Sequence, residues 1–271
     1  TEIRAGVSEV VVVGGMESMT NAPHIARNVA KGHDVPFGSL ESVLIGDGLK
    51  DAFTGESMGN TGETVAEEHG ITREESDKFA VRSHSKANEA WEKGWINEEV
   101  FPVGSLSTDE GIRPETNEEI LSSLRTVFSE DGQVTAGNAS QVSDGASAVL
   151  IASEEKAKRE GWPILARIVE YATSGVESDR VMSAPIPTVK KLLKITGMRL
   201  EDVDILEHNE AFASASCAIR GSLGIPDGSF NPHGGAIAIG HPLGATGARC
   251  LMTLVNAMRR RGSRRGIVTV C

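Results

Sequence analysis

Cysteine is scarce in this sequence: Cys217, Cys250 and Cys271 are the three in 271 residues. None of them belongs to a CxxC pair, so the sequence predicts neither a disulfide framework nor a zinc site, and we expect no bound metal. Sparse, scattered cysteine fits a reducing compartment. We therefore expect a cytoplasmic protein, while an organellar targeting segment ahead of the first residue stays an open alternative.

Long apolar runs and a surplus of positive charge are absent as well. No apolar stretch approaches the length of a membrane span, and residues 1–6 lack the apolar segment of a secretory signal. The formal net charge of −11 argues against a broad basic face for nucleic acid. The arginines within residues 259–265 are interpreted as cations at a helix C-terminus, with a patch for phosphates or a partner as the alternative. We expect no membrane and no nucleic acid as partner.

The residues that are present are typical of a soluble globular α/β protein with an ample core. Apolar segments alternate with helical patterns, which favours βαβ units and a covered sheet. Four valines before Gly14 and Gly15 predict a fully buried strand that ends in a turn at the glycines. The expected strands are residues 7–13, 145–153, 167–172, 204–207 and 267–271, and the expected helices are residues 187–196, 210–222 and 246–261.

Residues 20–131 have a different texture, with short helical patterns between polar connections. The clearest helix begins at Thr72, because Thr72 and Glu75 match a capping box, and it ends at Gly94. We interpret this region as an insertion into the α/β core. Residues 10–14 and 267–271 look like equivalent strands of two similar halves.

Three kinds of residue suited to thioester chemistry lie in the last third of the chain. His241 sits in a glycine-rich stretch, residues 231–249, where small residues let backbone approach a ligand closely. Asn209 begins the segment NEAFA, and Cys271 follows an apolar run. An imidazole, an amide and a thiol together can perform acyl chemistry. Taken alone, each has a structural explanation: a turn histidine, with Thr246 capping the next helix, a helix N-cap and an inert buried cysteine.

Four motifs, in this order, resemble those of the thiolases, the acetyl-CoA C-acyltransferases: GGMESM at residues 14–19, TAGNAS at residues 135–140, NEAFA at residues 209–213 and GHP at residues 240–242. The resemblance implies a layered αβαβα fold with two similar halves and an inserted loop domain. It divides the chain into the end of the N-terminal half (residues 1–19), the loop domain (20–131), the return to the N-terminal half (132–160) and an incomplete C-terminal half (161–271).

The resemblance also implies roles for the three residues. His241 would activate a nucleophilic cysteine and help to bind the thioester oxygen. Asn209 would hold a water that completes the oxyanion hole, with Glu210 able to orient it. Cys271 would act as the acid and base at the alpha carbon and at the CoA thiolate.

Binding of CoA, as a substrate rather than a cofactor, is implied for a further set of residues. Arg113 matches the position near the adenine and phosphate end. The other matches line the pantetheine arm, as a loop and as apolar walls: Ser140, Ala136, Val142, Phe128, Met58, Ala211 and Phe212. Without the resemblance these would be a solvated loop and ordinary core residues. Ser57 stands where acetoacetyl-CoA-forming relatives have a histidine, which leaves longer 3-ketoacyl substrates open. A homo-oligomer, dimer or tetramer, is expected.

The nucleophilic cysteine of the family has no match here, since all three cysteines come late in the sequence. We therefore expect an internal piece of a longer protein. The expected activity is thiolysis of 3-ketoacyl-CoA, or the reverse Claisen condensation, by a ping-pong course. One alternative is a non-catalytic CoA-binding protein or inactive fragment. Another is an NAD-dependent oxidoreductase that uses residues 240–247 as a phosphate-binding turn, although that stretch does not match G-x-G-x-x-G.

Overall fold

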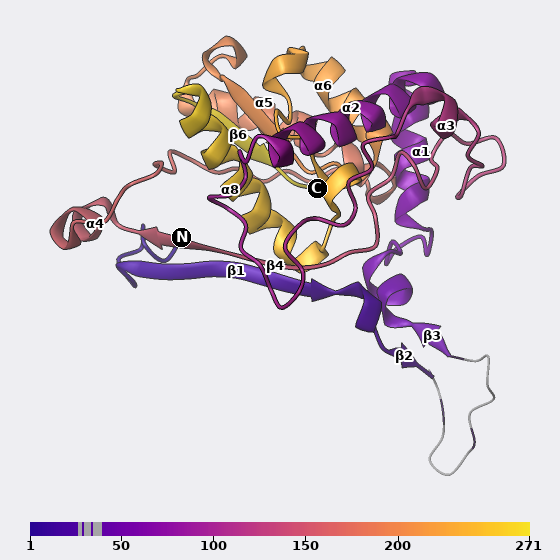
Figure 1. Ribbon diagram of the computed structural model, residues 1–271, viewed down its shortest axis with the longest axis horizontal. Helices are drawn as coiled ribbons and strands as arrows, with labels where there is room; N and C mark the ends of the chain where they lie inside the picture. The colour runs from indigo at the N-terminus through magenta and orange to yellow at the C-terminus, as the bar shows by residue number, and fades with distance from the viewer. Residues whose placement is uncertain (27–28, 30–33, 35–39) are drawn as a thin grey trace.

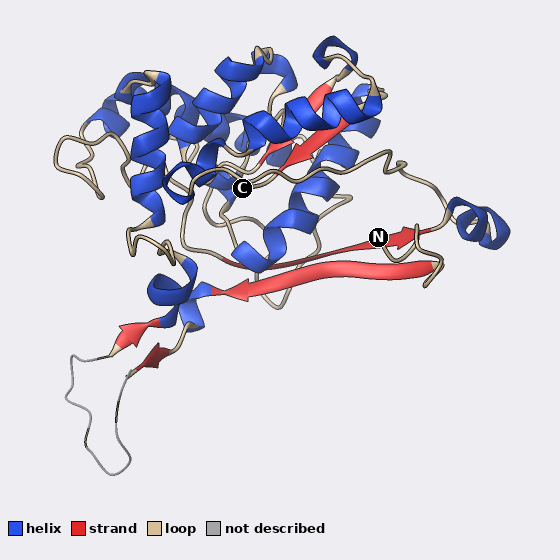
Figure 2. Ribbon diagram, turned by 180° about the vertical axis from the view of Figure 1, so that it is seen from behind, coloured by secondary structure: helices blue, strands red, loops and turns tan. Residues whose placement is uncertain are grey.

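The computed structural model describes residues 1–26, 29, 34 and 40–271. Helix α8 (Leu243–Arg261) lies between two of the sheets (Figures 1 and 2). One sheet pairs β1 (Val10–Ser18) with β4 (Asp144–Ala152) in antiparallel register. The other pairs β5 (Ile205–His208) with β6 (Gly266–Thr269) in parallel register. Helix α8 contacts all four strands. This sheet–helix–sheet arrangement is the layering that the sequence predicts.

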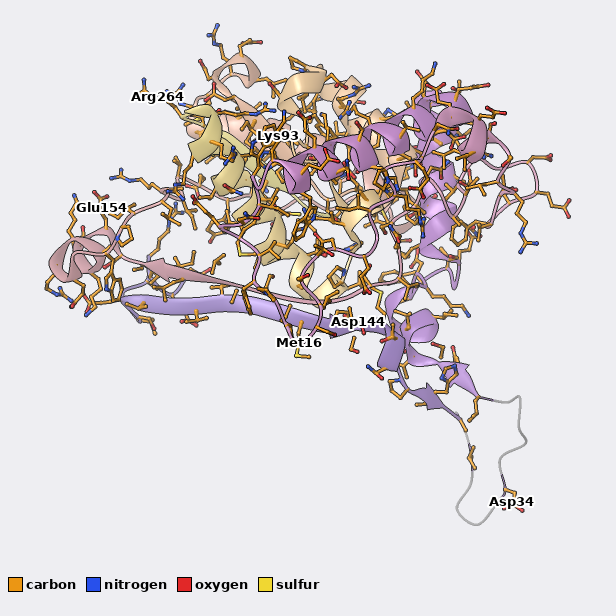
Figure 3. All side chains as sticks on the ribbon, in the orientation of Figure 1. Met16, Asp34, Lys93, Asp144, Glu154 and Arg264 are labelled. Atoms are coloured by element: carbon orange, nitrogen blue, oxygen red, sulfur yellow. The ribbon has the colours of Figure 1, made fainter. Side chains whose placement is uncertain are left out.

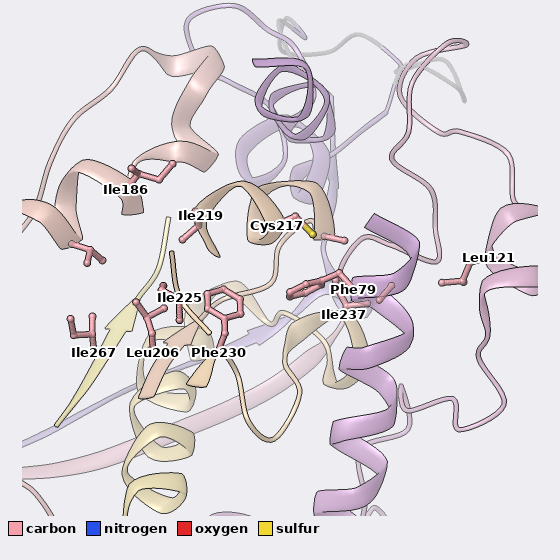
Figure 4. Close-up of a cluster of buried hydrophobic side chains, with 13 residues drawn as sticks. Phe79, Leu121, Ile186, Leu206, Cys217, Ile219, Ile225, Phe230, Ile237 and Ile267 are labelled. Carbon is pink, nitrogen blue, oxygen red and sulfur yellow. The ribbon is translucent and has the colours of Figure 1, made fainter. Parts of the chain in front are cut away.

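The main core covers the face of β5 and β6 that is turned away from α8. Helices α5 (Pro185–Thr196) and α6 (Ala213–Leu223) supply one side of it, and α2 (Arg73–Glu92) brings Phe79 from the inserted region. Figure 4 shows these apolar side chains meeting across elements far apart in the sequence. Members with almost no exposure include Leu206, Val189, Ile219, Phe230 and Ile237. The core therefore anchors the end of β5, from which Asn209 follows.

Residues 20–131 pack on the C-terminal part of the chain through two helices, of which α2 is the longer. Its N-terminus has both hydrogen bonds of the predicted capping box, from Thr72 Oγ1 and from the Glu75 carboxylate, and Gly94 follows its end with φ +65°. Helix α2 packs on α6 and on α7 (Ala236–Ile239). The other elements are α1 (Met58–His69), α3 (Glu118–Ser122), α4 (Glu154–Glu160), β2 (His24–Ile25), β3 (Glu41–Ser42), the π-helix η2 (Leu44–Gly48) and the 3-10 turns η1 (Met19–Asn21), η3 (Ser178–Ser183), η4 (Leu200–Asp202) and η5 (Asp227–Ser229).

Two expectations about strands are wrong. Strand β1 does not stop at Gly14, because its pairing with β4 continues to Ser18, and it is not fully buried: Val12 is 71% exposed on the face away from α8. Residues 167–172 form no strand, since no neighbouring strand supplies their backbone hydrogen bonds, and Val169 and Tyr171 stay exposed. The other predicted strands appear as β4, β5 and β6 with bounds shifted by one or two residues.

Helix starts were also placed imperfectly. Helix α6 begins at Ala213, three residues after the predicted start at Glu210. Helix α8 begins at Leu243, so Thr246 lies inside its first turn and does not cap it. The arginines at residues 259–261 do end α8, as the dipole argument predicts. Within the described residues no helix has both the length and the apolar character needed to cross a membrane.

Candidate active site

His241 lies in the short connection between α7 and α8. Gly240 ends α7 with φ +91°, and an added Cβ there would collide with the hydroxyl of Ser143. That hydroxyl accepts the backbone N–H of His241 over 3.1 Å. The glycine therefore permits both the turn and the close approach that holds the histidine backbone.

A chain of hydrogen bonds runs through the side chain of His241. Arg249 Nη2 lies 3.4 Å from Asn209 Oδ1, and Asn209 Nδ2 lies 3.0 Å from His241 Nε2. On the other side of the ring, Nδ1 lies 2.7 Å from Thr246 Oγ1, which donates to the carbonyl of Pro242 over 2.8 Å. Because the guanidinium can only donate, the network assigns the proton to Nδ1 and leaves the Nε2 lone pair facing the Asn209 amide.

The environment keeps this imidazole neutral. Burial, and secondarily the charge of Arg249, lowers the pKa of His241 from its ordinary value to about 4. At neutral pH the ring is therefore unprotonated at Nε2 and can accept a proton there. Once it holds that proton, Nε2 becomes a donor.

Asn209 is positioned by the sheet and not by a helix cap. Its backbone N–H donates to the carbonyl of Thr269 over 3.0 Å, which extends the β5–β6 ladder, and Phe212 is the residue before α6. The N-cap interpretation of Asn209 is therefore wrong. The orienting role for Glu210 stays a prediction; its carboxylate accepts from Ser83 Oγ at 2.5 Å and from Asn231 Nδ2 at 2.8 Å.

Cys271 packs against an apolar cluster that includes Ala211, two residues after Asn209. Its Sγ is 3.6 Å from Met182 Sδ, and burial raises the pKa of the thiol to about 11. Four predicted CoA-contacting residues belong to the same cluster: Met58, Phe128, Ala211 and Phe212. The rings of Phe128 and Phe212 meet edge to face with centroids 6.3 Å apart. The roles implied by the resemblance require Cys271 to lie close to His241. This stays a prediction, since the hydrogen-bond partners of His241 are Asn209 and Thr246, whereas Cys271 contacts Met182.

Met182 was missed by reasoning from sequence. It is 6% exposed in η3, and 89 residues separate it from the thiol that it touches. An apolar residue in a short polar turn carries no local signal of such a contact.

Three of the remaining predicted CoA contacts, Ala136, Ser140 and Val142, lie along one loop. The backbone N–H of Ser140 donates to the carbonyl of Ala211 over 2.9 Å, which joins this loop to the apolar cluster. Val142 and Ala136 are exposed on the same loop. Arg113 is exposed too, and its Nη2 lies 3.5 Å from Gln141 Oε1. The loop of residues 136–142 therefore contacts the apolar cluster through Ser140 and contacts Arg113 through Gln141.

Two hollows lie elsewhere on the described part of the molecule. One of about 300 Å³ lies between α2 and α6 and is lined by Phe79, Arg82 and Cys217 among others. The second, of about 280 Å³, has acidic walls near Asp77. Neither is lined by a predicted site residue. No group of three or more histidine, cysteine or acidic side chains suited to a metal occurs among the described residues.

Comparison with known families accounts for both halves of the chain. Residues 1–155 match the family model described as "Thiolase, N-terminal domain", and residues 162–271 match "Thiolase, C-terminal domain". The chain belongs to the thiolase family. The motif-based resemblance and the thiolase fold are both confirmed.

Named relatives of this thiolase are enzymes. The acetyl-CoA acetyltransferase of Pseudomonas aeruginosa is 43% identical over 99% of the chain and 71% of the relative, and that of Escherichia coli (strain K12) is 41% identical over the same shares. The crystal structure of human mitochondrial 3-ketoacyl-CoA thiolase has a TM-score of 0.94 at 40% identity, with 100% of this chain and 70% of that chain covered. A further structure of that protein is titled as a complex with CoA. The chain is thus an acyltransferase by family, which favours the enzyme over the non-catalytic and oxidoreductase alternatives.

Proposed function

We propose that His241, Asn209 and Cys271 carry the acyl transfer of this thiolase, in the thiolysis of a 3-ketoacyl-CoA and in the reverse Claisen condensation. The observation that supports this most is the 3.0 Å contact between Asn209 Nδ2 and His241 Nε2. Two polar groups from different motifs converge there, next to an apolar wall that could take an acyl chain. Donors that converge on a developing oxyanion are commonly the largest single contribution to such catalysis.

Each residue has a step that its protonation state suits. His241 Nε2 accepts the proton of the acyl-accepting thiol, whose sulfur attacks the 3-keto carbonyl. The bond between the alpha carbon and that carbonyl breaks, and the protonated Nε2 and the Asn209 amide donate to the thioester oxygen of the departing enolate. Cys271, protonated because its pKa is raised, gives its proton to the alpha carbon. The resulting thiolate then takes the proton of the incoming CoA thiol, whose sulfur attacks the carbonyl of the acyl-enzyme. The bond from that carbonyl to the enzyme sulfur breaks, and the released thiolate regains its proton from His241 Nε2.

The acyl-accepting thiol of this ping-pong course is none of the three cysteines of the chain. Burial raises the pKa of Cys217 and of Cys250 to about 12 and that of Cys271 to about 11. A nucleophilic cysteine needs accessible thiolate near neutral pH, and these environments disfavour it.

The 271-residue chain should therefore form no acyl-enzyme. We expect no stable label on Cys217, Cys250 or Cys271 after incubation with radioactive acetyl-CoA. Peptide mapping locates the label. Stable labelling of one of the three cysteines would show that the nucleophile has been assigned wrongly.

CoA and acyl-CoA are the proposed small-molecule partners, with Arg113 at the phosphate end and Ser140, Ala136 and Val142 beside the pantetheine arm. Ser57, the N-cap of α1, stands where acetoacetyl-CoA-forming relatives have a histidine, which leaves longer 3-ketoacyl substrates open. A homo-oligomer is proposed as well; the exposed apolar face of β1, with Val12 and Met16, supports it. The three free cysteines support the cytoplasm as the location.

Two substitutions test the assignment in the complete polypeptide. His241→Ala and Asn209→Ala should each lower kcat for thiolysis of a 3-ketoacyl-CoA by about a hundredfold or more, as for loss of an oxyanion donor. His69→Ala and Asn97→Ala replace exposed residues of the same types and serve as matched controls. Circular dichroism checks the fold of each variant. Near-normal turnover by His241→Ala would sink the assignment.

A further inference from the structure

One buried cation is absent from the mechanism above although it touches the site. Arg249 projects from α8 with 14% of its side chain exposed. Its guanidinium reaches two side chains, with Nη1 3.2 Å from Glu207 Oε1 and Nη2 3.4 Å from Asn209 Oδ1. Glu207 and Asn209 are two residues apart at the end of β5, so their side chains lie on the same side of the strand. The planar fork of an arginine suits two acceptors placed in this way.

The ion pair between Arg249 and Glu207 contributes little to the stability of the fold. Glu207 has no exposure, and within the described part of the chain Glu207 Oε2 and Arg249 Nε have no hydrogen-bond partner. Burial raises the pKa of Glu207, and the neighbouring guanidinium opposes that rise. A buried ion pair with unsatisfied atoms contributes little net stability. A role in positioning accounts better for its presence next to the site.

The guanidinium decides which end of the Asn209 amide faces His241. An asparagine amide has a donor end and an acceptor end of nearly the same shape. If the amide turned over, its oxygen would face His241 Nε2, and that nitrogen would need to carry the proton. The Nδ1 lone pair would then require Thr246 to donate to it, which breaks the bond from Thr246 to the carbonyl of Pro242.

We propose that Arg249, held by Glu207, is a positioning residue that keeps the N–H end of Asn209 directed at the oxyanion site and the lone pair of His241 free for a proton. The inference rests on the proposed function of Asn209 and His241. It adds Arg249 and Glu207, to which the motifs assigned no role. Both residues would affect kcat without contacting the substrate.

The charge of Arg249, like its contact with Asn209, keeps His241 Nε2 unprotonated. After burial, this guanidinium is the second cause that lowers the pKa of His241. Among the described residues, His208 on β5 also interacts electrostatically with the ring, and its own pKa is lowered to about 3, mainly by burial. Removal of the cation should therefore raise the pKa of His241.

The test is a double-mutant cycle in the complete polypeptide. Arg249→Met should lower kcat for thiolysis by about tenfold or more, with KM nearly unchanged, because it weakens one oxyanion donor. In the Asn209→Ala background the same change should have almost no further effect on kcat, since it acts through that amide. The acidic limb of the pH profile of Arg249→Met should move to higher pH. Arg259→Met, an exposed arginine of the same helix paired with Glu98, is the control.

Arg249→Lys keeps the charge without the fork, and should show a smaller loss of kcat that again vanishes in the Asn209→Ala background. Arg249→Lys replaces Arg249→Met in the double-mutant cycle if Arg249→Met does not fold. Losses that multiply in the double variant, or full activity of both Arg249 variants, would overturn the inference. Unchanged activity of Asn209→Ala alone would instead contradict the proposed function.

Discussion

At the scale of single residues, the site depends on the direction of hydrogen bonds more than on their number. Thr246 is buried and accepts from His241 Nδ1 while it donates to Pro242. The histidine is thereby held in one tautomer, with Nε2 available. The neutral state enforced by burial and the tautomer enforced by Thr246 are separate requirements for a base.

Thr246→Val removes the acceptor for Nδ1 and keeps the shape of the side chain. We expect kcat for thiolysis to fall by about threefold to tenfold, which corresponds to the net free energy of one hydrogen bond. Steady-state kinetics of the complete polypeptide measures this. Thr253→Val, on the same helix and also buried, is the matched control. An unchanged rate for Thr246→Val would remove Thr246 from the site.

At the scale of elements, backbone contact between β1 and the start of α8 positions the His241 connection. A Cβ added at Gly15 would collide with the carbonyl oxygen of Gly244, and one at Gly244 would collide with that of Met16. A Cβ at Gly145 on β4 would lie 2.8 Å from Pro242 Cγ. Glycine at these positions therefore lets the sheet closely approach Pro242 and Gly244, which follow His241 by one and three residues.

Gly15→Ala should force β1 and α8 apart. Because overpacking of this kind typically destabilises by about 1–3 kcal/mol, we expect a loss of free energy of unfolding in that range. Gly247→Ala is the control: it lies on the same helix with no atom within 4 Å of the added Cβ, and should stabilise by about 0.5–1 kcal/mol. Urea denaturation followed by circular dichroism measures both. Equal effects of the two substitutions would show that the close approach does not matter.

At the scale of the whole molecule, buried histidines from separate elements share one sign of pKa shift. Burial is the main cause that lowers the pKa of His84, His233 and His241 to about 4 and of His208 to about 3. Each is neutral when folded and takes up a proton near pH 6.5 when unfolded. Their contribution to stability is therefore present above that pH and is lost as the pH falls toward 4. Not every large side chain is buried: Figure 3 shows the side chain of Met16 pointing away from the molecule.

His84→Gln isolates one of these contributions. The imidazole Nδ1 of His84 accepts the backbone N–H of Arg113 over 3.1 Å, and a glutamine oxygen can replace it. As the pH falls from 6.5 to 4, the natural protein should lose stability relative to the variant by up to about 1.4 kcal/mol per pH unit. Denaturant unfolding at a series of pH values gives the difference. A difference that is constant with pH would contradict this role of burial.

Local sequence determined a good part of the molecule. The capping box of α2 and the glycine after it span few residues, so Thr72, Glu75 and Gly94 are sufficient to predict where that helix begins and where it ends. The motifs around Asn209 and His241 identified the family for the same reason, and they supplied the proposed site residues. Each is a short segment whose residue types carry the chemistry. The layered fold followed from the resemblance that these motifs support.

Only the tertiary structure decided which residues meet. The contacts of Arg249 with Asn209 and of Met182 with Cys271 join residues 40 and 89 positions apart, and no local pattern encodes such pairs. Strand β1 continues beyond Gly14 and Gly15 because β4 supplies hydrogen-bond partners for its backbone. Residues 167–172 have no neighbouring strand to pair with and form no strand. The physical reason is common to all of these. Apolar periodicity states that a face must be covered, but the covering partner depends on chain packing over long separations.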